Sequence, residues 1–151
     1  MKTKSETNIG GVKLVICKSP HGRLIRYTLR DGFDVIGEIS VLVGYAYDNA
    51  SDIERYLNYI ENNYHKTRDK MAYLCGFCIY DGFRKKGCGK SLLRHVLNEF
   101  KGYMLLLHAQ PMGMGDDFLD KESLYKFYQS MGFDFIPLDN KGAPLMGNSN
   151  D

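Results

Sequence analysis

The segment 84–100, RKKGCGKSLLRHVLNEF, combines two closely spaced glycines with a cluster of positive charge at the expected start of a helix. Gly87 and Gly89 would let the backbone approach an anion closely. The amides in the first turn of a helix have no acceptor within the helix, and the helix dipole favours negative charge there. The basic side chains belong to Arg84, Lys85, Lys86 and Lys90. The segment therefore predicts a site for phosphate groups.

Two common nucleotide motifs do not fit this segment. Gly89-Lys90-Ser91 resembles the end of a Walker loop, but the glycine required five residues earlier is Arg84. In a dinucleotide fingerprint the third glycine would stand where this chain has Leu92. The alternative to a phosphate site is a tight turn between a strand and a helix, with solvated lysines beside it.

Length and composition predict one domain spanning residues 1–151. The chain is 44% apolar and 25% charged, and its formal charge of +2 is too small to indicate a dedicated nucleic-acid or membrane binder. The first residues are polar, and no stretch approaches the roughly 20 apolar residues of a membrane span. We expect a cytoplasmic protein without a membrane partner.

The four cysteines are interpreted as small apolar core residues in a reducing compartment. Cys75 and Cys78 have the spacing of a redox or zinc motif. They fall in an expected strand, where residues three apart point to opposite faces, so the spacing argues against a disulfide and a shared metal. We expect no metal cofactor.

The first half of the chain is typical of an antiparallel meander followed by one helix. Strands are expected at residues 12–19, 23–30 and 34–47, with turns at Gly22 and Gly32, and an amphipathic helix at about 52–65.

The second half has a strand-helix-strand pattern. A strand at 72–80 leads through the glycine turn into a helix that stops at Gly102, and an apolar strand follows at 103–110. Asp120 is expected to cap a further helix that ends at Gly132. A last strand is expected at 133–138, and the tail at about 139–151 is expected to be mobile.

Two of these segments resemble the hallmarks of the GNAT N-acetyltransferase superfamily. Arg84-x-x-Gly87-x-Gly89, between a strand and a helix, is similar to its acyl-CoA-binding signature. The segment 124–133, LYKFYQSMGF, is similar to its second hallmark, with the tyrosine at Tyr128. The resemblance implies an α/β (α+β) fold with a mixed, centrally splayed sheet flanked by helices. It also implies acetyl-CoA as the acetyl donor for an amine acceptor.

The resemblance assigns the donor site to the glycine turn and the strand before it. The strand edge at Phe77, Cys78 and Ile79 would pair with the pantetheine arm of the donor. The strands at 71–80 and 103–110 would separate to let the thioester through. The residues expected around the pyrophosphate are Arg84, Lys85, Lys86, Gly87, Cys88, Gly89, Lys90 and Ser91.

By the same resemblance Tyr128 would give a proton to the departing thiolate. The base is less well defined, because Tyr73 stands where many protein-acetylating members carry a glutamate. His108 is the first candidate for this role and Glu38 the second, with an ordered water as a further alternative.

The acceptor side departs from the family pattern. Members usually have two helices between their first two strands, whereas residues 19–22 leave room only for a turn. The acceptor could be a protein amine, a small amine or aminoacyl-tRNA. Aminoacyl-tRNA is the acceptor of toxin members that the sequence also resembles, so an RNA partner stays open. A homodimer is a further possible partner. The rival interpretations are an acyl-CoA-binding module without turnover and a nucleic-acid binder that uses its basic turn.

Overall fold

A strand-helix-strand unit carries the glycine turn. In the computed structural model, which describes residues 2–44, 50–80, 87–110, 120–137 and 144–151, β5 covers Met71–Ile79, α2 covers Cys88–Glu99 and β6 covers Tyr103–His108. The inner side of α2 buries Leu92, Leu93 and Val96, as their helical spacing predicts. The two strands are parallel neighbours, so the predicted crossover unit is confirmed.

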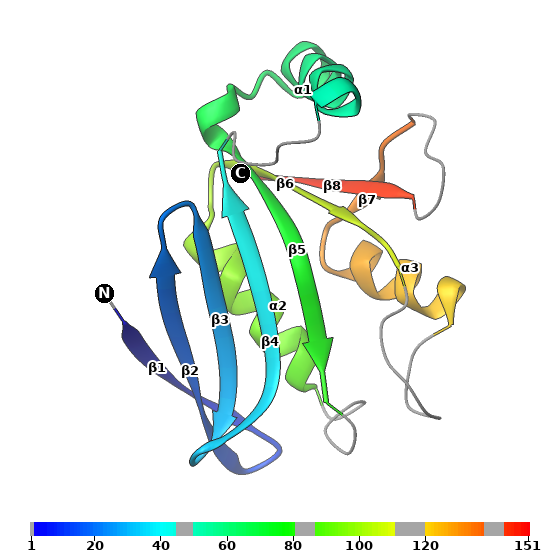
Figure 1. Ribbon diagram of the computed structural model, residues 1–151. Helices are drawn as coiled ribbons and strands as arrows, with labels where there is room; N and C mark the ends of the chain where they lie inside the picture. The colour runs from blue at the N-terminus through cyan, green and yellow to red at the C-terminus, as the bar shows by residue number, and fades with distance from the viewer. Residues whose placement is uncertain (1, 45–49, 81–86, 111–119, 138–143) are drawn as a thin grey trace.

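The remaining strands extend this unit into one open sheet of eight strands in the order β1-β2-β3-β4-β5-β6-β8-β7 (Figure 1). Among these described strands, β5 and β6 run parallel, and every other neighbouring pair is antiparallel. The meander consists of β1 (Thr3–Ile9), β2 (Val12–His21), β3 (Leu24–Asp31) and β4 (Asp34–Val43). This mixed sheet with its flanking helices is the predicted fold class.

Strand β1 was not expected from the sequence. Its residues, TKSETNI, are polar, and most of their side chains are exposed. The strand lies at the edge of the sheet and pairs only with β2, so its sequence does not show the apolar alternation of a half-buried strand. Backbone pairing with β2, over seven residue pairs, defines it instead.

The expectation of a mobile tail at 139–151 is wrong for its last part, whereas residues 139–143 lie outside the described residues. Strand β8 (Leu145–Asn150) pairs with β6 on one side and with β7 (Asp134–Phe135) on the other. The last expected strand is thus only two residues long. Leu145 and Met146 are buried. The segment has few apolar residues, so its sequence did not predict this burial.

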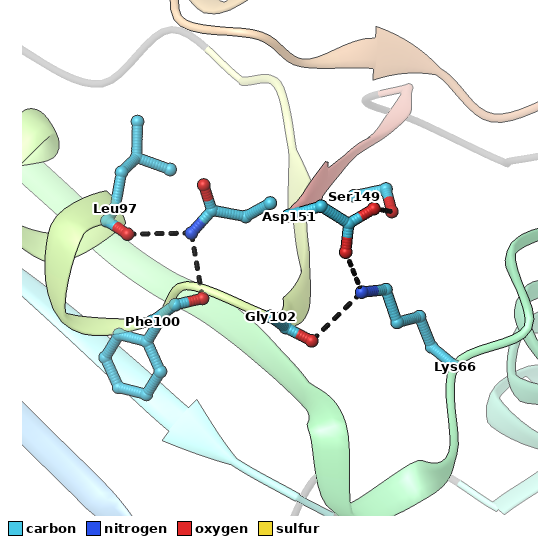
Figure 2. Close-up of polar contacts among 7 residues, drawn as sticks. Lys66, Leu97, Phe100, Gly102, Ser149 and Asp151 are labelled. Carbon is cyan, nitrogen blue, oxygen red and sulfur yellow. Dashed lines mark hydrogen bonds and ion pairs between the residues drawn. The ribbon is translucent and has the colours of Figure 1, made fainter.

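Polar contacts hold the end of β8 in place (Figure 2). The Asn150 side chain donates to the backbone oxygens of Leu97 (2.7 Å) and Phe100 (2.8 Å), which lie at the end of α2. Lys66 forms an ion pair with Asp151 and donates to the Gly102 oxygen at 3.0 Å. The polar residues that suggested a mobile tail therefore bind the carboxyl end of α2. Through Lys66 the tail is also linked to the turn at Gly102, which precedes β6.

Helices cover both faces of the sheet. Helices α2 and α3 (Lys121–Ser130) contribute to one core cluster, on what we call the α2 face. Helix α1 (Ala50–Tyr64) packs Leu57 and Ile60 into a second cluster, on what we call the α1 face. A short 3-10 helix, Arg68–Lys70, leads into β5. The predicted helix cap is confirmed, because the Asp120 side chain accepts from the Ser123 amide at 2.7 Å.

Within the described ranges, no helix has both the length and the apolar character needed to cross a membrane.

Candidate active site

The two parallel strands form a fork. Their ladder holds three residue pairs, Met71 with Met104, Ala72 with Leu105 and Tyr73 with Leu106, and ends there. On its other edge β5 stays paired with β4 as far as Ile79, opposite Gly37. Figure 1 shows the two strands diverging from this short ladder. The predicted separation of the central strands is confirmed.

A β-bulge lies in β5 just beyond the apex of the fork. The register with β4 passes from Leu74 opposite Val41 to Gly76 opposite Ser40, leaving Cys75 as the extra residue. Leu74 and Phe77, three residues apart, consequently pack on the same core cluster. A glycine within an expected strand was the signal in the sequence for this irregularity.

The bulge overturns the argument from alternation for the two neighbouring cysteines. Cys75 is the extra residue of the bulge and Cys78 lies beyond it, so the two side chains are expected to share a face rather than oppose each other. Cys75 is also exposed, not buried, and its thiol lies 3.5 Å from the Ser40 oxygen. Burial of the thiol itself raises the pKa of Cys75. Within the described ranges, no three His, Cys, Asp or Glu side chains gather as a metal site would need.

Tyr73 and His108 meet at the apex of the fork. The Tyr73 hydroxyl lies 2.5 Å from Nδ1 of His108, and the ring centroids are 5.6 Å apart. Tyr73 is the last residue of β5 that pairs with β6, opposite Leu106, and His108 lies two residues beyond Leu106. Both side chains lie on the α1 face, because Met104 and Leu106 alternate with Leu105 and pack in the α1 cluster. The sequence motif marks Tyr73 only as the position of a missing glutamate, whereas the parallel register of the two strands places it beside His108.

Glu38 lies apart from this pair. It stands opposite Cys78, whereas Tyr73 stands opposite Leu42. The five residue steps from Tyr73 to Cys78 correspond to roughly 15 Å along the strand. Glu38 therefore lies toward the end of β5 that precedes the glycine turn, and His108 lies nearer the bulge.

The described part of the glycine turn begins a helix in the way an anion site requires. Gly87 is the N-cap of α2 with φ 84°, in the left-handed region that favours glycine. The Ser91 amide donates to the Gly87 oxygen at 3.0 Å, so the amides of Gly89 and Lys90 precede that helical bond. Lys90 is exposed. Arg84, Lys85 and Lys86 lie outside the described residues.

Gly89 also has a packing role that the sequence did not indicate. A Cβ atom placed on it would lie 3.4 Å from both Phe77 and Ile79. The bare glycine thus lets α2 approach β5 closely, and its φ is not in the left-handed region. Cys88 beside it is buried in the core cluster, so its side chain supports the turn from inside.

Tyr128 lies on the α2 face with its ring among other aromatic rings. Phe77 of β5 is one neighbour, with ring centroids 6.4 Å apart, and Phe133 is another, at 5.8 Å. Only 7% of Tyr128 is exposed, and burial raises the pKa of its hydroxyl to about 12. No hydrogen bond joins this hydroxyl to any residue in the part of the chain that the structure describes. Tyr128 therefore stays neutral at physiological pH.

Several solved structures with a similar fold are named as acetyltransferases, some of them of the GNAT family. No protein-family model and no curated protein matches the chain in sequence. An acetoin utilization protein from Exiguobacterium sibiricum has a TM-score of 0.65 at 14% identity, over 99% of this chain and 86% of that one. The ribosomal-protein-S18-alanine N-acetyltransferase from Escherichia coli has a TM-score of 0.53 at 13% identity, over 98% and 93%.

A GNAT-family acetyltransferase from Staphylococcus aureus has a TM-score of 0.50 at 16% identity. That match covers 83% of this chain but 66% of the other, so the chain spans just under two thirds of that protein. At these identities the likeness concerns the fold. The chain has the GNAT acetyltransferase fold, as the two sequence motifs predicted.

Proposed function

We propose that this protein is an acetyl-CoA-dependent N-acetyltransferase. The observation that carries the proposal is the fork between β5 and β6, which opens beside the glycine turn of α2. Buried Tyr128 lies on one face of the sheet, and the Tyr73–His108 pair lies on the other. A slot between two strands can hold a long thioester with a proton donor on one face and a proton acceptor on the other.

The donor site is assigned to the residues that line one arm of the fork. The β5 segment from Phe77 to Ile79 would offer its backbone to the amide groups of the pantetheine arm. The first-turn amides of α2 would hold the pyrophosphate, with Lys90 supplying charge. Acetyl-CoA would supply an activated acetyl carbonyl and a thiolate leaving group. The bare Gly87, with its left-handed backbone, supports this fit.

His108 is proposed as the base that takes the proton from the acceptor amine. The amine nitrogen forms the new bond to carbon, the carbon–sulfur bond breaks, and the electron pair goes to sulfur. The contact of Nδ1 with the Tyr73 hydroxyl would hold the His108 ring in place, and a neutral imidazole is a base suited to proton removal near neutral pH. The distance of Glu38 from the apex makes it the second candidate.

Tyr128 is proposed to stabilise the leaving thiolate and return a proton to it. Its hydroxyl is a neutral donor at working pH, because its pKa is raised. Since a thiol has an ordinary pKa near 8.5, proton transfer from this phenol to a free thiolate is uphill. The phenol therefore donates a hydrogen bond as the carbon–sulfur bond breaks, and a proton that it gives up is replaced from solvent. In each turnover the amine loses one proton and the thiol gains one, and exchange with solvent returns His108 and Tyr128 to their starting protonation states.

A protein amine is the first acceptor to test. Strands β2 and β3 are joined by the short turn at Gly22, so no helix between them narrows the α1 face of the meander. An open face favours an extended acceptor over a small enclosed one. By its name, the Escherichia coli neighbour acts on an alanine of a ribosomal protein. Small amines and aminoacyl-tRNA are the other two classes in the panel.

Free thiol released from acetyl-CoA, with mass spectrometry of the acceptor, tests the proposal. The panel is a set of peptides with free N-termini, small amines and aminoacyl-tRNA. Binding of acetyl-CoA with acetylation of one class is the expected result. Binding without transfer to any class would favour an acyl-CoA-binding module, and the absence of binding would overturn the proposal.

A further inference from the structure

The outer edge of β1 carries a charge pattern that is complementary to itself. Reading Thr3-Lys4-Ser5-Glu6-Thr7 outward from Ser5 gives opposite charges at the first step and threonines at the second. The strand is at one end of the sheet order, and its residues 3–6 are exposed (Figure 1). An exposed strand edge can pair with another strand.

The register with β2 assigns these side chains to faces. Ser5 and Thr7 lie opposite Ile16 and Leu14, which belong to the α2-face core. Lys4 and Glu6 alternate with them and therefore lie on the α1 face. Glu6 already forms an ion pair with Lys13 of β2, at 3.2 Å, with both side chains largely exposed.

We propose that β1 pairs antiparallel with β1 of a second copy of this chain, about a two-fold axis at Ser5. In this register Lys4 faces the partner's Glu6 and Glu6 faces the partner's Lys4. Thr3 faces the partner's Thr7 on the other side of the sheet, and Lys2 faces the partner's Asn8. Opposite charges and paired threonines across strands are favourable.

The neighbouring symmetric registers are disfavoured by charge. An axis at Lys4 would oppose two lysines directly, although Lys2 would then face the partner's Glu6 on either side. An axis at Glu6 would oppose two glutamates with no favourable charge pair beside them. Charged side chains usually protect an edge strand by repulsion. Of these three registers, the one with its axis at Ser5 has favourable charge pairs and no like charges directly opposite each other, so the charges favour that register.

The dimer would continue the sheet from one protomer into the other. Because the two-fold axis relates residues of the same face, both copies of α2 lie on one side of the joint sheet. The interface is small, so we expect a weak dimer with a dissociation constant on the order of 0.1 to 1 mM. This inference is independent of the proposed catalytic function.

Charge reversal tests the register by sedimentation at increasing protein concentration. Lys4→Glu places a glutamate opposite the partner's Glu6 at two symmetry-related places, and Glu6→Lys places a lysine opposite the partner's Lys4 at two. Each variant should dimerise at least about tenfold more weakly than the wild type. An equimolar mixture of the two variants should recover the wild-type affinity. In the mixed dimer, each of the two glutamates of one chain faces a lysine of the other. Unchanged melting curves check the fold.

Three outcomes would overturn the proposal: a wild type that stays monomeric through the millimolar range, single variants that dimerise like the wild type, or a mixture that does not recover. Crosslinking adds a second measure. Ser5→Cys places two thiols directly opposite each other at the axis, whereas Thr7→Cys faces the partner's Thr3. Oxidation should crosslink the first variant and not the second, above the wild-type background from Cys75. Equal yields would contradict the register.

Discussion

The Tyr73 hydroxyl lies 2.5 Å from Nδ1 of His108 at the apex of the fork between β5 and β6. The pair stands where the parallel ladder ends, and it joins the two strands on the α1 face. A histidine whose Nδ1 is bonded to a hydroxyl has a fixed ring orientation. The first prediction depends on this contact.

His108→Gln should lower turnover and remove the acidic limb of the pH–rate profile, because the proposed base is lost. Tyr73→Phe keeps the ring and removes the hydroxyl, so the limb should remain and move to another pH. Acetyl-CoA affinity should change little in either variant. The profile of kcat/KM, measured with two acceptors of different pKa, separates the two effects. If His108→Gln leaves the profile unmoved, Glu38 or water is the better base.

Tyr128→Phe should lower kcat by a factor of about 10² to 10⁴, the usual range for a lost general acid. The aromatic contacts to Phe77 and Phe133 depend on the ring and should persist. Acetyl-CoA affinity by calorimetry and the melting temperature serve as controls. Full turnover in the variant would contradict the role of the hydroxyl.

The same substitution has a signature in stability at alkaline pH. The pKa of Tyr128 is raised from 10 to about 12 in the folded state, because burial disfavours the phenolate. The stabilisation from the neutral phenol is complete below pH 10 and is lost as the pH rises toward 12. Relative to Tyr128→Phe, the wild type should lose on the order of 2 to 3 kcal/mol of unfolding free energy across that window. Urea unfolding from pH 9 upward, where the native fold persists, should show the difference growing, and parallel curves would contradict the raised pKa.

Asn150→Ala should destabilise the fold, because the Leu97 and Phe100 oxygens at the end of α2 lose the Asn150 amide as a donor, although the Phe100 oxygen keeps the Tyr103 amide at 3.1 Å. The expected loss is about 1 to 2 kcal/mol in urea unfolding. Ser149→Ala is the matched control, since the Ser149 hydroxyl donates to the exposed Asp151 carboxylate and not to the end of a helix. Equal stability of the two variants would mean that the Asn150 contacts contribute little.

Gly87→Ala should weaken acetyl-CoA binding by at least about tenfold, because an alanine resists the left-handed backbone that aims the first amides of α2. Gly102→Ala is its control. Gly102 has a similar φ of 88° and open space around it, but it follows the other end of the same helix. Both variants should lose similar stability, and only the first should lose affinity by calorimetry. If Gly87→Ala and Gly102→Ala bind acetyl-CoA with similar affinity, the glycine turn has only a structural role.

The sequence predicted the features that depend on local pattern. Leu92, Leu93 and Val96 marked the inner side of α2, and Asp120 marked the start of α3. The crossover unit followed from a helix between two apolar strands, and the fold from two short motifs. These signals lie within a few residues of the structure that they determine.

Features that depend on distant partners were not predictable in the same way. β1 lies at the edge of the sheet, so its polar sequence gives no alternating pattern. β8 has few apolar residues, and its place in the sheet depends on pairing with β6 and β7. The bulge at Cys75 arises from the register with β4, so the faces of the two cysteines could not be derived from alternation alone. The role of Tyr73 in orienting the proposed base follows only from its contact with His108 in the folded chain.

The unequal pairing of the sheet has a consequence for how the chain folds. Strands β1 to β4 are joined by three successive hairpins, whereas β6 must find β8 from a distant part of the sequence, and only three residue pairs connect β5 to β6. Local pairing costs less chain entropy and forms faster than distant pairing. The meander is therefore expected to gain protection from hydrogen exchange first during refolding, and the β6–β8 ladder last. The slot between the two central strands would then be the final feature of the fold to take shape.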